Sequence, residues 1–328
     1  YYAVGLQSST LNSGQGSDKI IIELLEDRFV YGAFGLENSE INTGSGDDEV
    51  EITITSSKDD AFTSYAVKNS SIELGEGNDN LNISQNNSSG NLDIAISGEV
   101  SYSVLYDFGS GDDVGSFYSE GYGIKSDGAN RHKVVLGEGD DSFNISSVYS
   151  SFYKSILYAN EGNDQIDLRA SNQAHYGIED SDIYLGDGDD YLTIDSSKNS
   201  NIDGGAGTDS IKILDSSENY IIENLQSNNF EITNSNDGFF KLSLSNVEQI
   251  SFNDKNISLL DGSDYGNLVI RGNSIYTIIE GPSWTEAEAN ANKLGGNLIT
   301  INDKEEYSWG ANNIWSKQNY ISKGLNAD

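Results

Sequence analysis

Short runs of alternating apolar and polar residues recur along the first two-thirds of the chain. Each run places two aliphatic or aromatic residues two positions apart, with a polar residue between them in all but the first run. A period of two puts such residues on one face of a β-strand, so each run predicts a strand with an apolar inner face. The predicted inner pairs are Ile20 and Ile22, Val50 and Ile52, Leu81 and Ile83, Phe143 and Ile145, Ile166 and Leu168, Leu192 and Ile194, and Ile211 and Ile213.

Further β-type runs lie between these pairs, at 29–31, 61–67, 92–96 and 134–136, and Ser, Asn and Gly residues separate them. Apolar runs bounded by turn-forming residues are typical of strands. Each repeat of the chain is therefore predicted to hold two or three strands. Stacking of the repeats would give a parallel β-solenoid whose inner pairs form an apolar ladder.

A glycine and aspartate motif, G-x-G-x-D, stands before each inner pair and once more before Gly115, whose inward position makes that copy the weakest. Successive copies lie 19 to 34 residues apart, which is the length of a solenoid turn. The final residues are Asp18, Asp48, Asp79, Asp113, Asp141, Asp164, Asp190 and Asp209. The paired residues before them are Gly14 and Gly16, Gly44 and Gly46, Gly75 and Gly77, Gly109 and Gly111, Gly137 and Gly139, Asn160 and Gly162, Gly186 and Gly188, and Gly205 and Gly207.

The motif supplies the groups that calcium binds. Glycine adopts positive φ angles at little cost, so the backbone carbonyl oxygens of such a loop can turn inward. The aspartate adds a carboxylate oxygen, and Ca²⁺ takes about six to eight oxygen ligands of these kinds. Because one loop cannot supply that number, we expect two stacked loops to share an ion. The alternative is a row of metal-free turns, which would need neither the second glycine nor an aspartate in register.

Residues 204–212 match the pattern G-G-x-G-x-D-x-U-x at every fixed position. The chain thereby resembles proteins with hemolysin-type (RTX) calcium-binding repeats over about two-thirds of its length. The resemblance implies an all-β fold with a right-handed parallel β-solenoid over residues 1–215. It also implies that the eight aspartates and the residues paired before them hold Ca²⁺, with up to about seven ions between stacked loops.

The sequence departs from that family in two ways. Its motif occurs once per long turn instead of in tandem, so only one edge of the solenoid is expected to carry calcium. The opening glycine of the nonapeptide is replaced in all copies except that at Gly204, by Ser13, Thr43, Leu74, Phe108, Leu136, Ala159 or Leu185. The acidic residues directly before the aspartates are weaker candidates for further ligands; they are Asp47, Asp112, Asp140 and Asp189.

Composition narrows the class of protein. The 328 residues include 53 acidic and 18 basic ones, for a net charge of −35. Such a charge would repel nucleic acid and anionic membrane surfaces, and it disfavours a compact state unless cations bind. The chain has no cysteine, which excludes disulfides and thiolate metal sites. No stretch is apolar enough for a membrane helix.

The G-x-G-x-D repeats stop after Asp209, and the rest of the chain has different sequence patterns. Residues 216–262 resemble the β segment that follows hemolysin-type repeats and are predicted to cap the solenoid, and 263–267 form a linker. Ser283 to Glu286 is a helix capping box, and a second helix is expected from Asn302. Residues 268–328 resemble the first half of an α+β C-type lectin-like domain. The segments that bind sugar in that family, E-P-N or Q-P-D and W-N-D, do not occur here.

The sequence argues against an enzyme. It has no H-E-x-x-H, G-x-S-x-G or G-K-[ST] motif, and His132 and His175 stand apart and are expected at the surface. Clustered carboxylates could form a glycosidase pair, but the repeat already accounts for nearly all of them. We therefore expect an extracellular or cell-surface, calcium-binding structural or adhesive module of a larger protein. The alternative is a calcium-folding carrier segment of a secreted enzyme or toxin whose active domain lies outside this chain.

The predicted extracellular function also indicates candidate partners. Calcium is the expected cofactor, and the candidate partners are cell-surface or matrix glycans, matrix proteins and copies of the chain itself. Neither nucleic acid nor direct insertion into a membrane is expected from so acidic a sequence.

Overall fold

The computed structural model describes eleven stretches of the chain: 3–26, 33–56, 64–87, 94–98, 104–126, 131–226, 228–259, 269–271, 274–276, 283–293 and 297–311. The strand predicted at 29–31, the predicted linker at 263–267 and the chain end from 312 lie outside these stretches.

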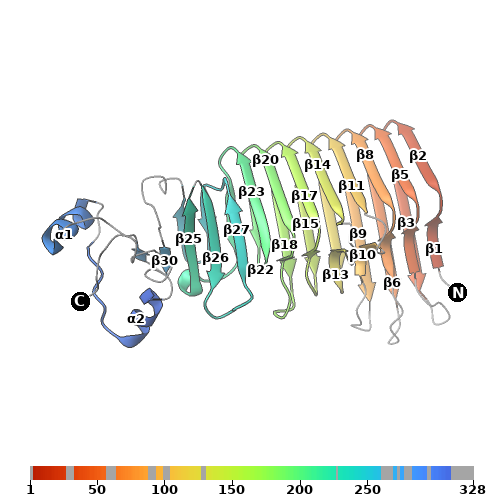
Figure 1. The fold of residues 1–328 in the computed structure, drawn as a ribbon. Helices are drawn as coiled ribbons and strands as arrows, with labels where there is room; N and C mark the ends of the chain where they lie inside the picture. Colours follow the sequence, from red (N-terminus) through yellow and green to blue (C-terminus); the bar gives the residue numbers. More distant parts are fainter. Residues whose placement is uncertain are drawn as a thin grey trace.

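Most of the described chain forms three long sheets, which we name A, B and C (Figure 1). Sheet A has eight strands, β1 (Ala3–Gln7), β4 (Ala33–Glu37), β7 (Tyr65–Lys68), β10 (Ile94–Gly98), β13 (Tyr122–Ser126), β16 (Phe152–Tyr153), β19 (Ile178–Glu179) and β22 (Ser197–Lys198). Sheet B begins with β2 (Thr10–Gln15), β5 (Glu40–Ser45), β8 (Ser71–Glu76), β11 (Leu105–Ser110), β14 (Lys133–Glu138), β17 (Ile156–Glu161), β20 (Asp182–Asp187) and β23 (Ser200–Ala206). Sheet C holds β3 (Lys19–Glu26), β6 (Glu49–Ser56), β9 (Asn80–Asn87), β12 (Val114–Ser119), β15 (Ser142–Ser147), β18 (Gln165–Ala170), β21 (Tyr191–Ile194) and β24 (Ser210–Ile213).

The chain visits the sheets in the fixed order A, B, C, so three consecutive strands make one rung and each rung has three corners. Every strand of these rungs pairs in parallel with its equivalents in the neighbouring rungs. Gly44, for example, is the register partner of both Gly14 and Gly75. The expectation of an all-β chain of stacked parallel strands is confirmed, with three strands in each rung.

The predicted inner pairs form the core. Val50, Ile52, Leu81 and Ile83 are at most 1% exposed, and the later pairs are equally buried. Ile20 and Ile22 belong to the first rung and are only partly buried. The replaced opening residues of the motif also face inward, since those from Thr43 to Leu185 are buried. These side chains fill the core beside the loops, which is why the position does not require glycine.

Gly115, at the inward position of the fourth rung, lies against aromatic side chains. A Cβ atom at this position would lie 2.5 Å from Cδ2 of Phe143 and 2.8 Å from Cζ of Phe108. Phe143 packs edge-on against Phe108 and Phe117, with ring centroids 6.0 and 5.2 Å apart. The glycine therefore leaves room for a cluster of aromatic rings in the core.

Beyond the eighth rung the stack continues briefly and then reverses direction. A short 3₁₀ helix, η1 (Ser217–Asn219), precedes β25 (Tyr220–Gln226), β26 (Asn229–Asn234), β27 (Lys241–Ser245), β28 (Gln249–Ser251) and β29 (Asn256–Ser258). β27 and β28 pair in parallel with β23 and β24 and so extend sheets B and C. β25, β26 and β29 add antiparallel strands at the ends of these sheets. The antiparallel strands cover edges that the last parallel strands would otherwise expose.

The remaining elements lie at the end of the stack opposite the N-terminus (Figure 1). β30 (Val269–Arg271) pairs with β25, and β31 (Ser274–Tyr276) pairs with β30. α1 (Trp284–Lys293) begins at the predicted capping box, where Oγ of Ser283 accepts the Glu286 N–H at 3.3 Å. In α2 (Lys304–Gly310), Trp309 packs against Tyr276 and Ile221. Neither described helix has the length and apolar character needed to span a bilayer.

Candidate metal centre

The G-x-G-x-D motifs form the corner between sheets B and C, which we name the glycine corner. Both glycines of each motif have positive φ angles, such as 109° at Gly75 and 132° at Gly77. A Cβ atom at Gly75 would lie only 1.9 Å from the carbonyl oxygen of Gly44 in the preceding rung. The glycines thus allow a backbone turn and a close contact between loops, and neither is open to another residue without strain. Asn160, with φ 79°, is the single replacement in the row.

The eight predicted aspartates form one row along this corner. In each pair of neighbouring rungs, the backbone N–H of one aspartate donates to Oδ1 of the aspartate in the next rung, at 2.6–3.0 Å. All of them except Asp18 in the first rung are at most 2% exposed. The structure therefore brings together the residues that the sequence singled out, and we call this arrangement the aspartate ladder.

The second carboxylate oxygen of the ladder is the unusual feature. Oδ2 of all eight aspartates is buried and has no hydrogen-bond partner in the described structure. A buried oxygen of this kind is costly, and a charged one more so. The ladder thus presents a row of oxygen atoms that the described chain itself does not satisfy.

Burial and mutual repulsion raise the pKa values of the six ladder aspartates from Asp79 to Asp209. Burial raises the pKa of Asp113 to about 8, although the Asp79 N–H lowers it and the neighbouring carboxylates add a further increase. The same causes raise the pKa to about 7 at Asp164 and Asp209. A nearby positive charge would favour the ionised carboxylates and lower these pKa values again.

The residues directly before the aspartates form a second, exposed ladder that runs in the opposite direction. From Asn78 to Thr208, each donates its backbone N–H to the side chain of its equivalent in the preceding rung, at 2.7–3.1 Å. Asp47, Asp112, Asp140 and Asp189 belong to it, together with the neutral Asn78 and Asn163. Because asparagine serves equally well, these residues act as hydrogen-bond acceptors that hold the loops together. Their assignment as further ligands has no support in these contacts.

Glu248 ends the aspartate ladder and was not singled out from the sequence. Its Oε2 accepts the backbone N–H of Asp209 at 2.8 Å, where every earlier rung uses an aspartate. Its own N–H donates to the carbonyl oxygen of Asp209 at 3.1 Å. Glu248 is thus a ninth carboxylate in the row. In the sequence, Glu248 belongs to the alternating run V-E-Q-I-S-F at 247–252, within the predicted cap.

The donor set of the row suits an oxygen-binding cation. Among the described residues, no group of three His, Asp or Glu side chains converges on one point. An ion at the glycine corner would therefore be held by aspartates of adjacent rungs together with loop carbonyl oxygens. Such a mixed, all-oxygen set is typical of Ca²⁺ and unlike the nitrogen and sulfur sets of zinc.

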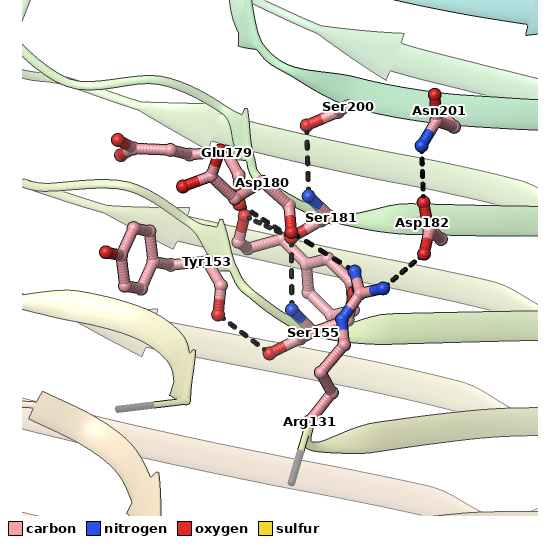
Figure 2. Close-up of polar contacts among 10 residues, drawn as sticks. Arg131, Tyr153, Ser155, Glu179, Asp180, Ser181, Asp182, Ser200 and Asn201 are labelled. Carbon is pink, nitrogen blue, oxygen red and sulfur yellow. Dashed lines mark hydrogen bonds and ion pairs between the residues drawn. The ribbon is translucent and has the colours of Figure 1, made fainter. Parts of the chain in front are cut away.

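We name the corner between sheets A and B the serine corner. It also links neighbouring rungs by side-chain hydrogen bonds, but the side chains are mostly uncharged serines. A residue with positive φ, such as Asn38 or Asp180, precedes a serine in most rungs. The serine Oγ accepts the N–H of the serine in the preceding rung at 3.0–3.2 Å, as Ser181 does from Ser155 (Figure 2). The same hydroxyl donates to the carbonyl oxygen two residues earlier, at 2.7–3.1 Å. Each serine is thereby fully satisfied by the protein.

His132 occupies a serine position of this corner, and the expectation that it lies at the surface is wrong. It is 0% exposed, and its Nδ1 accepts the Val104 N–H at 3.0 Å. The neighbouring Arg131 pairs with Asp182 and donates to the carbonyl oxygens of Ser155 at 2.6 Å and Asp180 at 3.2 Å (Figure 2). Both residues thus join neighbouring rungs at this corner.

The second histidine lies at the corner between sheets C and A. His175 is half-buried beside Tyr149, with ring centroids 4.5 Å apart, and burial lowers its pKa. It lies in an aromatic contact, away from the aspartate ladder.

No protein-family model matches the chain, and no curated protein matches it. The hemolysin-type and C-type lectin-like resemblances therefore rest on the motifs alone.

Proposed function

We propose that the chain is a calcium-dependent structural or adhesive module of an extracellular protein. In this proposal, Ca²⁺ ions lie between neighbouring loops of the glycine corner, with up to about seven ions along the row. The observation that carries it is the row of eight buried Oδ2 atoms that have no hydrogen-bond partner in the part of the chain that the structure describes. A row of this kind is expected if each oxygen binds an ion in the working protein.

The charge of the chain supports a divalent cation. A net charge of −35 disfavours compaction, and the ladder concentrates part of it at one buried corner. Calcium would neutralise the carboxylates and replace the missing hydrogen-bond partners in one step. Magnesium fits less well, because it demands an octahedral shell and keeps most of its water.

The expected affinity supports a location outside the cell. Calcium sites of extracellular modules commonly have dissociation constants of about 10⁻⁴–10⁻³ M, which suits calcium-rich surroundings. Calcium binding would then contribute directly to folding, as metal binding does in other small metal-dependent domains. A rod that becomes rigid only outside the cell suits a protein that spaces or attaches other modules.

Calcium binding by the intact chain tests the proposal. The bound metal would be counted by elemental analysis after equilibrium dialysis, and thermal unfolding would be followed by circular dichroism with calcium, with magnesium and with a chelator. We expect several bound Ca²⁺ ions per chain and a melting temperature that rises steeply with calcium but little with magnesium. Fewer than two bound ions, or equal melting in calcium and chelator, would contradict it.

A further inference from the structure

A second candidate binding site lies on the outer face of sheet C and begins directly after the aspartates of the glycine corner. A groove of about 590 Å³ crosses the strands β15, β18, β21 and β24. Its polar lining includes Asn144, Gln165, Asp167, Arg169, Tyr191 and Lys212. Grooves of this size are within the range that holds small ligands or short segments of longer ones.

The register of sheet C explains the shape of the groove. Ser142 pairs with Gln165, which pairs in turn with Tyr191. Ser146 of the same strand pairs with Arg169. Short serine side chains on β15 thus lie beside the longer side chains of Gln165, Arg169 and Tyr191 on the following strands. This difference in side-chain length leaves a hollow on the outer face of the sheet. On the other side of β15, Tyr118 is 42% exposed and pairs with Ser146. Tyr118 thus lies beside the groove in the row of Ser146 and Arg169, whereas Tyr191 lines it in the row of Ser142 and Gln165.

The charge of the groove is opposite to that of the molecule. Its lining holds two cations, Arg169 and Lys212, and one carboxylate, Asp167, in a chain of net charge −35. Asp167 forms an ion pair with Arg169, whose side chain is still 51% exposed. Lys212 forms no ion pair with the residues that the structure describes. The local excess of positive charge would attract an anionic group where most of the surface repels one.

The remaining groups of the groove suit a sugar. The ring of Tyr191 offers an amphipathic surface against which the C–H face of a pyranose can pack. The amides of Asn144 and Gln165 can donate to and accept from sugar hydroxyls. Arg169 donates its Nε and Nη2 to the Asp167 carboxylate, and the carboxylate or sulfate ester of a sugar would match the same planar pair of donors by displacing Asp167. Successive rungs are about 4.8 Å apart, on the scale of successive sugars in an extended chain.

We propose that this groove binds an acidic glycan, through pyranose units that carry carboxylate or sulfate groups. The inference rests on the proposed adhesive role, for which it supplies the ligand class. Asp167 limits the affinity, because it competes with the glycan for Arg169.

Binding would be measured by calorimetry on the intact chain saturated with calcium. The probes are a galacturonate trisaccharide, a sulfated galactose trisaccharide and a neutral cellotriose. We expect the acidic probes to bind and the neutral one to bind at least about tenfold more weakly, with an affinity for the acidic probes that falls as ionic strength rises. The ratio of the two acidic probes identifies which anionic group the groove prefers.

Three variants give opposite expectations. Arg169→Gln and Lys212→Gln should each weaken acidic probes about tenfold, whereas Asp167→Asn should strengthen them several-fold. Lys19→Gln is the matched control, because Lys19 lies on sheet C and pairs with Glu49 outside the groove. It should leave binding unchanged.

The inference fails if neither acidic probe binds, if neutral and acidic probes bind equally, or if Lys19→Gln weakens binding as much as Lys212→Gln. Concentration-dependent dimerisation that Lys212→Gln abolishes, without glycan binding, would also overturn it and identify a second copy as the occupant. Circular dichroism and calcium content, measured on the same samples, show whether the chain is folded and calcium-loaded. A failure of glycan binding can then be distinguished from a failure of the proposed calcium-dependent function. A folded, calcium-loaded chain that ignores the glycans contradicts only the groove.

Discussion

The glycine corner and the serine corner both turn the chain from one sheet to the next and hydrogen-bond neighbouring rungs to each other, but they do so with different side chains. Both turn the chain between sheets with positive φ angles, and both let a side chain accept an N–H from the preceding rung. They differ in what happens to the rest of the accepting group. The serine hydroxyl returns its hydrogen to a carbonyl oxygen of its own rung, whereas Oδ2 of each aspartate has no hydrogen-bond partner among the described residues. One corner is complete within the described protein, and we propose that a cation completes the other.

The two corners also differ in which residues occupy the position of the accepting side chain. Val104 and His132 replace serine at the serine corner, so that corner accepts apolar and aromatic side chains. The aspartate is present in all eight copies of the motif at the glycine corner. Packing alone would not demand a carboxylate at every level, but a shared ion would.

The largest expected effect comes from the backbone of the glycine corner. Gly75→Ala would place its Cβ 1.9 Å from the Gly44 carbonyl oxygen at a positive φ angle. We expect a loss of about 3 kcal/mol or more in the free energy of unfolding in calcium. Asn38→Gly at the serine corner, where φ is 51°, should be neutral or stabilising by less than about 1 kcal/mol. Urea unfolding of both variants checks the pair, and equal losses would show that the corners do not differ.

Truncation of the accepting side chain should separate the corners by their response to calcium. Asp141→Ala removes a carboxylate from the middle of the ladder, so it should cost about 3 kcal/mol in calcium and much less in chelator. Ser181→Ala removes a neutral acceptor and should cost about 1–2 kcal/mol in both conditions. Unfolding curves with and without calcium measure the four values. A calcium-independent cost for Asp141→Ala would argue for metal-free turns.

The pH dependence of the metal-free protein should reveal the carboxylates. The folded pKa is raised to about 8 at Asp113 and about 6 at Asp79, from an ordinary value of 3.8. The folded state therefore holds more protons than the unfolded state between about pH 4 and 8, and its stability falls as pH rises through this range. Calcium should remove most of this fall. Melting temperatures in chelator that rise from pH 5 to pH 8 would contradict the expectation.

The smallest effect is expected at the end of the row. Glu248→Gln keeps an oxygen acceptor for the Asp209 N–H but removes a charge. It should weaken at most the terminal calcium site and lower the melting temperature by a few degrees in calcium only. Gln249→Glu is a neighbouring charge control with the opposite sign. Loss of several ions in Glu248→Gln would show that the row does not consist of separable sites.

The sequence predicted the repeated part of the fold well because its signals are local. Two glycines and an aspartate, followed by an apolar pair, fix a turn and a strand within about ten residues, as at Gly137 to Ile145. The parallel stacking and the single row of aspartates follow from repetition of that unit. The second, exposed ladder was harder to predict from the sequence, because Asp140 and Asn163 accept the same hydrogen bond but differ in charge.

The unpredicted features depend on contacts between distant, dissimilar residues. Glu248 meets Asp209 across 39 positions and carries no glycine motif, so only the parallel pairing of β28 with β24 reveals it. His132 is buried because it occupies a serine position, and the serine corner has a weak signature, a turn residue followed by serine. An alignment of that signature at Asn38, Asn69 and Asn199 could have shown this corner from the sequence.

The central claim, that the glycine corner is complete only with a cation, is tested most directly by Asp164→Asn at pH 8. The substitution keeps the oxygen that accepts the Asp141 N–H and removes a buried charge whose pKa is about 7. We predict opposite signs: a higher melting temperature than wild type in chelator, and a lower one in saturating calcium. A change of the same sign and size in both conditions would contradict the account.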